Sequence, residues 1–210
     1  MSGFKINKDD LVAGLKLNSE DELENFILSS LSLSGHNIKG VTLKNGIIEL
    51  TDLSSANLQK SYFKNVILDD NSLIATDFSS SSFESIEFKK DIMSGILLNE
   101  VEFKDVQFLN CKLNLANFRM AKLTNVEFID CDLSEADFYQ AELKNVKLKG
   151  CNLEACNFSQ VKLNNVDLRE SGIMNLKGFD SLKGAITNNH QLIQIAPALA
   201  VNSGIIIKED

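Results

Sequence analysis

Large apolar side chains recur at every fifth position over most of this chain. From Leu33 to Ile173, 29 consecutive positions spaced by five hold Leu, Ile, Phe or Met without exception. A period of five matches neither an α-helix, which repeats every 3.6 residues, nor a flat strand, which repeats every two. The pattern is therefore an internal repeat that returns each large side chain to one common interior.

A second restricted position lies two residues before each large one. From Val101 onward this position holds only Val, Cys, Ala or Ser. The other three positions of each five carry mostly Asp, Asn, Lys, Glu, Ser and Gln, which we expect to face solvent. A chain with two inward and three outward residues in five can wind as a square coil, with one pentapeptide per side and about 20 residues per turn.

Three stretches show the repeat unit clearly: Ala116–Met120, Ala136–Gln140 and Cys151–Ala155. They resemble the A(D/N)LXX units of the pentapeptide-repeat family. The resemblance implies an all-β solenoid, a right-handed quadrilateral β-helix whose coils stack about 4.8 Å apart. Residues 31–175 would then form about seven coils, a tower roughly 35 Å tall. Residues 1–30 would form an N-terminal cap, and residues 176–210 a C-terminal cap and dimerisation segment.

Residues 20 apart should stack in columns along such a tower. Nine phenylalanines would form three columns: Phe63, Phe83 and Phe103; Phe88, Phe108 and Phe128; Phe118, Phe138 and Phe158. Four asparagines would share one corner, where left-handed backbone suits them: Asn65, Asn125, Asn145 and Asn165. Four charges of alternating sign would form cross-strand pairs: Glu102, Lys122, Glu142 and Lys162. Asp91 breaks the apolar pattern, so we expect local irregularity near residues 91–97.

The two ends leave the repeat and should cap it. Ser19 and Glu22 match a capping box, which predicts a short helix over the N-terminal coil. After Ile173 the phase slips, and residues 189–201 have the pattern of a helix. Pro197 should kink or restart this helix, and Gly204 should end it.

Apolar residues in the C-terminal segment predict an interface with a second copy of the chain. Consecutive exposed isoleucines would favour aggregation in a monomer, so we expect them to pair. The predicted dimer interface comprises Leu192, Ile195, Leu199, Ile205, Ile206 and Ile207.

A repeat tower, a helix and Gly-Ile-Ile-Ile near the terminus are similar to the quinolone-resistance (Qnr) and mycobacterial MfpA proteins. This resemblance implies a dimer joined through its C-terminal region that binds DNA gyrase and topoisomerase IV, in part by mimicking duplex DNA. The repeat runs without interruption from residue 33 to residue 173, so the tower looks more like the loopless MfpA branch.

The net charge of −8 argues against direct binding of nucleic acid, which needs Lys and Arg. It permits DNA mimicry, since a negatively charged rod could enter a basic groove. The candidate mimic surface comprises Asp52, Asp77, Asp132, Glu135, Asp137 and Glu154. Basic residues such as Lys112, Arg119, Lys144 and Lys149 are interleaved with these acids, so an ordinary solvated surface remains an equal explanation.

No pattern in the sequence predicts catalysis, a cofactor or a metal. All four cysteines occupy small inward positions, which indicates core packing. His36 and His190 are far apart, and no G-x-S-x-G or phosphate-loop motif is present. No 18-residue apolar run or basic-then-apolar leader is found, so we expect a cytoplasmic protein that does not contact a membrane. Two hypotheses remain: a topoisomerase-directed DNA mimic, or an interaction scaffold with an unknown partner.

Overall fold

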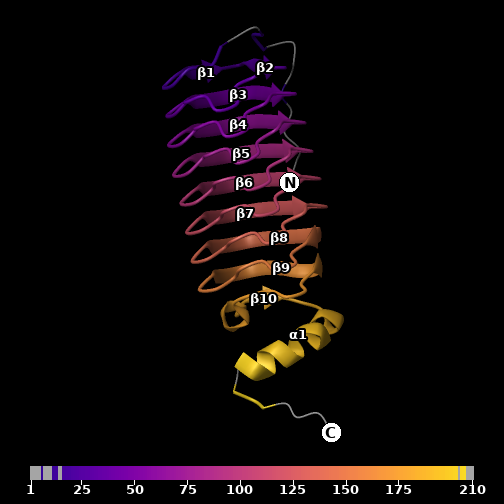
Figure 1. The fold of residues 1–210 in the computed structure, drawn as a ribbon. Helices are drawn as coiled ribbons and strands as arrows, with labels where there is room; N and C mark the ends of the chain where they lie inside the picture. The colour runs from indigo at the N-terminus through magenta and orange to yellow at the C-terminus, as the bar shows by residue number, and fades with distance from the viewer. Residues whose placement is uncertain (1–5, 7–10, 14–15, 203, 207–210) are drawn as a thin grey trace.

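The chain forms a tower of stacked coils closed at its C-terminal end by one helix (Figure 1). The computed structural model describes residue 6 and residues 11–13, 16–202 and 204–206. The strands are β1 (Glu22–Glu24), β2 (Ile27–Ser29), β3 (Thr42–Glu49), β4 (Tyr62–Asp69), β5 (Ser82–Lys89), β6 (Glu102–Leu109), β7 (Lys122–Ile129), β8 (Glu142–Asn152), β9 (Lys162–Gly172) and β10 (Ala185–Ile186). A 3-10 helix, η2 (Phe179–Ser181), and an α-helix, α1 (Asn189–Asn202), complete the chain.

Neighbouring coils are parallel and offset by 20 residues, as the sequence predicts. Phe63 of β4 lies beside Phe83 of β5, which lies beside Phe103 of β6. Isolated bridges on the other sides of the tower keep the same offset, for example Asn57 beside Asp77. The predicted parallel β-solenoid is thus confirmed. It has one more turn than the expected seven, because β1 and β2 form a further coil above β3.

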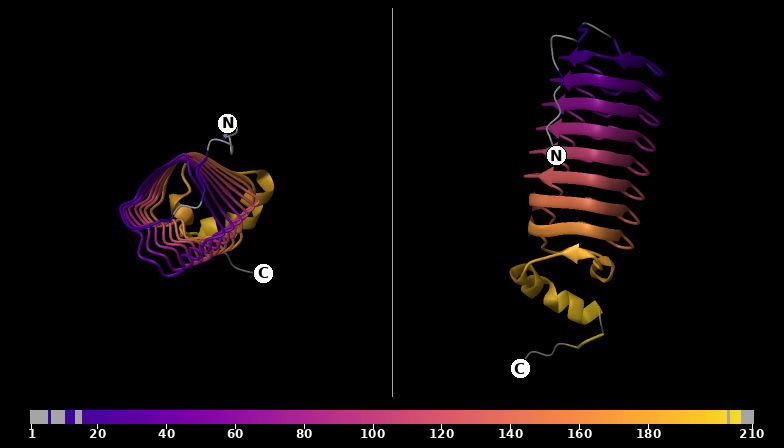
Figure 2. Two further views of the ribbon diagram at one scale, coloured as in Figure 1. Left: turned by 90° about the horizontal axis from the view of Figure 1, so that it is seen from above. Right: turned by 180° about the vertical axis from the view of Figure 1, so that it is seen from behind.

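From Glu20 to Asn175, every fifth residue except Glu170 adopts left-handed backbone, which gives each turn four corners. In the coil that starts at β4 the corners are Asn65, Asp70, Ala75 and Ser80, with φ between 52° and 58°. Seen from above, successive coils have the same outline, each slightly displaced from the one before it (Figure 2). The regular change of direction explains why the sequence repeats every five residues.

The predicted asparagine corner is confirmed as a ladder of side-chain amides. Asn65 donates to Asn45 at 2.9 Å, and Asn165 donates to Asn145 at 3.0 Å. Asn125 continues the ladder by donating to Asp105 at 2.8 Å. Asn suits a corner because its side chain tolerates positive φ and can still bond along the column.

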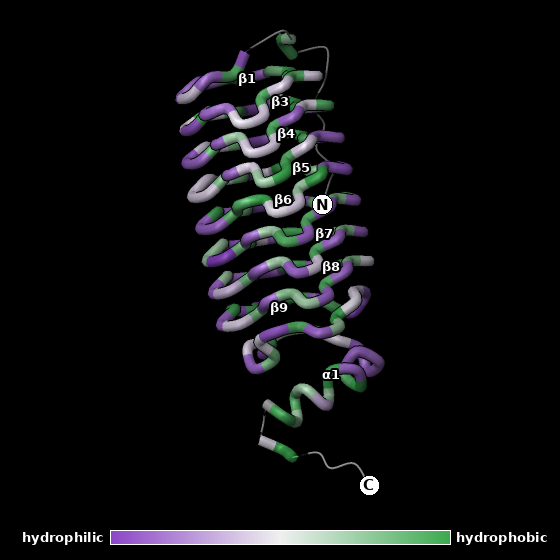
Figure 3. Tube along the Cα trace, viewed as in Figure 1, coloured by the Kyte–Doolittle hydropathy of each residue, from purple (hydrophilic) through white to green (hydrophobic). Residues whose placement is uncertain are grey.

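All three predicted phenylalanine columns are stacked inside the tower. Phe118 and Phe138 have ring centroids 4.7 Å apart with 3° between the planes. Phe88 and Phe108 are likewise 4.7 Å apart, with 2° between the planes. The Phe63–Phe83 pair completes the set at 4.7 Å. Apolar and polar residues alternate along each coil (Figure 3), so the inward faces supply one continuous core.

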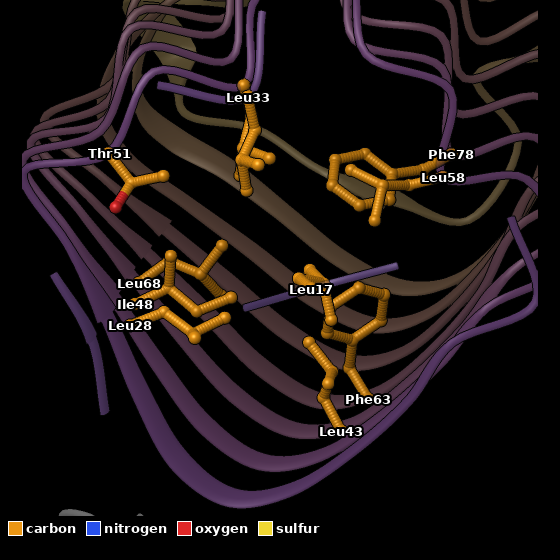
Figure 4. A pocket seen from close by; sticks show the side chains of 11 residues that line it. Leu17, Leu28, Leu33, Leu43, Ile48, Thr51, Leu58, Phe63, Leu68 and Phe78 are labelled. Atoms are coloured by element: carbon orange, nitrogen blue, oxygen red, sulfur yellow. The ribbon is translucent and has the colours of Figure 1, made fainter. Parts of the chain in front are cut away.

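The core becomes aliphatic near its N-terminal end, where Leu17 closes it. Leu17 is buried, and its side chain points into the tower interior together with Leu43 and Phe63 (Figure 4). These residues line a small apolar pocket with Thr51 on one wall. The pocket marks the place where stacked rings give way to smaller side chains.

The predicted N-terminal helix is wrong. Residues 22–24 and 27–29 form β1 and β2, which pair with β3 in the same 20-residue register. Leu23 and Leu28 continue the period of five, so the coil geometry begins within the segment assigned to the cap. Ser19 donates to the carbonyl of Asn37 in the next coil rather than capping a helix.

Gly46 leaves room for a large side chain from the first coil. Phe26 occupies a small inward position and is fully buried, with its ring over Gly46. A Cβ at Gly46 would overlap that ring. The large residue in one coil is therefore compensated by the absent side chain in the next.

The expected irregularity near residues 91–97 is also wrong. Asp91 faces inward, and Ile92 and Leu97 keep their bridges to the coils on both sides at the usual offset. Asn71 in the preceding coil bonds to the Asp91 carboxyl group, so the ladder continues without distortion.

The predicted phase slip after Ile173 is confirmed. Ala185 of β10 pairs with Val166 of β9, an offset of 19 residues instead of 20. α1 then runs through Pro197 as one helix, so the chain does not restart its helix at that residue. The helix ends at Asn202, and the predicted terminator Gly204 follows it in left-handed backbone. The Gly204 and Ile205 amides donate to the carbonyls of Val201 and Ala200.

Side chains at the start of α1 close the last coil. Asn188 and Gln191 form a reciprocal capping box, with bonds of 2.9 and 3.0 Å. Gln191 also donates to the carbonyls of Leu168 and Ser171 at 2.6 and 2.8 Å. The helix thereby satisfies acceptors at the open edge of the sheet as well as covering the core.

Candidate functional site

The acidic residues of the repeat motif shape the turns of their own coils. Oδ1 of Asp52, Asp77 and Asp137 accepts the amide N–H two residues later at 2.9–3.0 Å. Asp132 does the same at 3.1 Å. Asn117 occupies an equivalent position and makes the same bond at 3.0 Å. The choice of Asp or Asn in the motif therefore follows from turn formation, which either side chain performs.

Only part of the candidate mimic surface is brought together. Glu135 bonds through its amide to the carbonyl of Glu154 in the next coil, and Asp132 accepts the side-chain amide of Asn152 at 3.2 Å. Asp132, Glu135 and Glu154 thus gather on one side, and Asp137 follows beyond the corner.

Asp52 and Asp77 lie several coils away from that group. The column from Asp52 to Asp132 contains Ser72, Ile92 and Lys112. The column from Asp77 to Asp137 contains Leu97 and Asn117. The six candidate acids consequently do not form an unbroken negative stripe.

Many other surface charges are neutralised by ion pairs between successive coils. Lys122 lies 2.9 Å from Glu102, and Lys162 lies 2.6 Å from Glu142, which confirms the alternating column. Hydrogen bonding to Glu102 raises the pKa of Lys122, and hydrogen bonding to Lys162 lowers the pKa of Glu142. These columns hold the coils in register rather than presenting one sign of charge.

The charge is nevertheless unevenly distributed along the tower axis. Residues 16–100 contain 13 acidic and 7 basic residues, whereas residues 101–202 contain 12 and 11. The negative excess of the described chain therefore lies mainly in its N-terminal half.

The most exposed large apolar side chains of the described residues lie at the C-terminal end. Ile193 of α1 is 73% exposed, and Ile206 beyond the helix is 82% exposed. Leu192 and Ile205 are also exposed, as predicted for an interface. A shallow cleft lies beside them, lined by Leu176, Lys177, Gly178, Phe179, Pro197, Ala198 and Val201.

Two of the proposed interface residues face the chain itself. Ile195 is buried against the last coil, and Leu199 is partly buried against the same core. Ile207 lies outside the described residues. Ile193 is not part of the predicted interface, yet it is more exposed than Ile195 and Leu199. The face of α1 that carries Ile195 and Leu199 packs on the tower, and Ile193 lies on the other face.

The cysteines lie in the core as free thiols. Cys111, Cys131, Cys151 and Cys156 are all buried. Burial raises the pKa of the Cys156 thiol to about 12, so it has little thiolate character at neutral pH. Within the described part of the chain, no three His, Cys, Asp or Glu side chains are grouped to hold a metal ion.

The regular coils and the motif positions agree with comparisons to known families. The family description "Pentapeptide repeat region" matches residues 81–158 and 122–178, and "Pentapeptide repeats (8 copies)" matches residues 49–84. The chain belongs to the pentapeptide-repeat family. No curated protein sequence matches this pentapeptide-repeat chain. Among its described helices, none is long and apolar enough to cross a membrane.

Several solved pentapeptide-repeat structures are similar to it. HetL, from the cyanobacterium Nostoc and involved in heterocyst differentiation regulation, is 18% identical, with 84% of this chain and 93% of HetL covered and a TM-score of 0.39. A trypsin-treated QnrB1, a plasmid-mediated fluoroquinolone resistance protein, is also 18% identical, with coverages of 95% and 99% and a TM-score of 0.37. Rfr23, from the cyanobacterium Cyanothece, is 15% identical, with coverages of 75% and 91% and a TM-score of 0.27.

Proposed function

We propose that this chain is a non-catalytic scaffold that binds a protein partner along a side of its tower. The observation that carries the proposal is the use of its polar residues: motif acids form turns, and opposite charges pair between coils. Such a surface is a rigid array of side chains at a spacing of about 4.8 Å. Its four free cysteines are in keeping with a reducing compartment, so we place the scaffold in the cytoplasm.

A type II topoisomerase is the partner that we propose to test first. The net charge of −8 favours a partner with a basic groove, which gyrase would provide if the tower mimics DNA. The solved relative QnrB1 is described as a fluoroquinolone resistance protein, which makes quinolone the natural second variable.

The decisive experiment is a gyrase supercoiling assay with and without quinolone. The matched variant replaces Asp52, Asp77, Asp132 and Asp137 by Asn, and Glu135 and Glu154 by Gln. Asn117 shows that Asn preserves the turn bond, so this variant should remain folded. We expect the native chain to change supercoiling or quinolone inhibition and the variant to lose that effect. A native chain that alters neither reaction would contradict the topoisomerase proposal and leave the scaffold proposal standing.

We further propose that two copies join through their C-terminal ends. Leu192, Ile193, Val201, Ile205 and Ile206 are each 49–82% exposed at the same end of the tower. An isologous contact between two such ends would close a dimer instead of extending a filament. It would also place the two acidic N-terminal halves at the far ends of the assembly.

Light scattering at tens of micromolar tests the dimer, with Ile206→Asp as the disruptive variant. Leu50→Asp is the matched control, since Leu50 is 57% exposed and lies on a corner near the other end. We expect a dimer for the native chain and for Leu50→Asp, and a monomer for Ile206→Asp. A monomeric native chain would refute this arrangement.

A further inference from the structure

One inward column of the tower is polar over most of its length. Its members are spaced by 20 residues and all are buried: Thr51, Asn71, Asp91, Cys111, Cys131, Cys151, Ser171 and, from α1, Gln191. The column contains one ionisable carboxyl group, that of Asp91, which is 0% exposed.

The inward polar side chains other than Asp91 follow a common rule. Eight donate to the backbone carbonyl 23 residues earlier, in the preceding coil: Asn71, Thr76, Ser81, Cys131, Cys151, Cys156, Ser171 and Gln191. Three donate to the carbonyl two residues earlier: Thr51, Ser61 and Cys111. An inward polar side chain in this tower is therefore placed to donate a hydrogen to a backbone carbonyl.

Asp91 has the same placement but lacks a hydrogen when ionised. Its Oδ1 accepts bonds from the backbone amide and the side-chain amide of Asn71, both at 2.8 Å. Its Oδ2 is the one buried side-chain nitrogen or oxygen among the described residues that has no partner. The carbonyls 23 residues and two residues before Asp91 belong to Leu68 and Lys89, so these are the acceptors that the other inward polar side chains predict for Asp91. A carboxylate only accepts hydrogen bonds, whereas a carboxylic acid also donates one.

We propose that Asp91 is a neutral carboxylic acid in the folded tower, with its Oδ2–H donating to the carbonyl of Leu68 or Lys89. The tower then takes up one proton in its middle coils when it folds between about pH 4 and pH 7. Loss of that proton would set a buried negative charge against carbonyl oxygens and weaken the contact between the coils of β4 and β5.

The surroundings of Asp91 favour the neutral form. The preceding coil contributes Asp69, whose negative charge opposes ionisation, and the corner residue Asp70. Within its own coil, the ammonium group of Lys89 is already paired with Glu87. The following coil contributes the buried Cys111 thiol.

Burial acts in the same direction as these charges. It is the main cause that raises the pKa of Asp91 to about 7, and the bonds from Asn71 and from the backbone of Lys89 oppose it. The unfolded value is 3.8, so the folded state binds the proton more tightly. Protonation of Asp91 therefore stabilises the fold fully below about pH 4. Between about pH 4 and pH 7 the folding equilibrium constant falls roughly tenfold per pH unit, and above about pH 7 the contribution of Asp91 is absent.

Asp91→Asn tests this inference, because an amide of nearly the same shape accepts from Asn71 and also donates. Urea unfolding should give a ratio of folding constants, variant to native, that grows about tenfold per pH unit between pH 4 and pH 7 and is constant above. Asp69→Asn is the control, since it removes a neighbouring charge without supplying the donor, and its ratio should change much less. A ratio for Asp91→Asn that is independent of pH would overturn the proposal.

Carbon-13 NMR of aspartate carboxyl groups in the native chain provides a second readout that does not need the variant to fold. One carboxyl resonance should still be in its neutral-acid position at pH 6 and titrate near neutral pH. Ionised positions for all aspartates at pH 6 would refute the proposal.

Discussion

Phe118 lies where two aromatic columns meet, and its removal provides a direct test of the core. Its ring is fully buried, stacks on Phe138 at 4.7 Å and meets Phe128 edge-on at 6.1 Å with 88° between the planes. Phe118→Ala removes a buried ring and leaves a cavity, which costs about 3–5 kcal/mol of unfolding free energy. Since 1 kcal/mol shifts the Tm of a chain of this size by roughly 2–4 °C, we expect a fall of about 6–20 °C.

Scanning calorimetry and urea unfolding monitored by circular dichroism would measure this change. Phe118→Leu is the matched control, because it keeps much of the buried volume and removes the ring contacts. Each aromatic pair adds about 0.5–1.5 kcal/mol beyond burial, so the Leu variant should lose some stability. It should lose less than the Ala variant, because it leaves a smaller cavity. An Ala variant that melts within 2 °C of the native chain, a margin of about 1 kcal/mol or less, would refute the account of a close-packed aromatic core.

Three other substitutions test particular contacts. Gly46→Ala should lose about 1–3 kcal/mol, because its Cβ overlaps the Phe26 ring, and a smaller residue at position 26 should restore the melting temperature. Leu115→Asn should gain roughly 0.5–1 kcal/mol, since Leu115 is 55% exposed at φ 60°, a conformation that Asn tolerates better; an unchanged urea midpoint would contradict this. Lys122→Glu should lower Tm at low salt by placing a third negative charge between Glu102 and Glu142, and high salt should remove the difference.

The acidic surface shows why the candidate site was only partly predictable. The sequence placed Asp77 and Asp137 outside the core, and the structure agrees that both are half-exposed. It gave no sign that their carboxylates accept amide hydrogens at 2.9 Å, because an Asx turn depends on the φ and ψ of three successive residues. The distance between two acids of one column, such as Asp52 and Asp132, likewise depends on how many coils lie between them.

The N-terminal segment shows a local signal overruled by a distant one. Ser19 and Glu22 fit a capping box in sequence, but a helix there would leave the upper edge of β3 without partners. Pairing of Glu22–Glu24 with β3 satisfies that edge and buries Phe26 over Gly46. The period of five at Leu23 and Leu28 was the available signal for this outcome.

The spacing of large and small apolar residues determined the coil, its 20-residue turn and the stacked columns, because each side of the coil is a local unit of five residues. Only the tertiary structure decided how polar groups inside and outside the tower find partners. Asp91 illustrates the difference: its sequence position signalled an irregularity, whereas the coil above it supplies two donors from Asn71 and keeps the ladder regular. Those partners are 20 residues away, and their geometry exists only when one complete turn has stacked upon another.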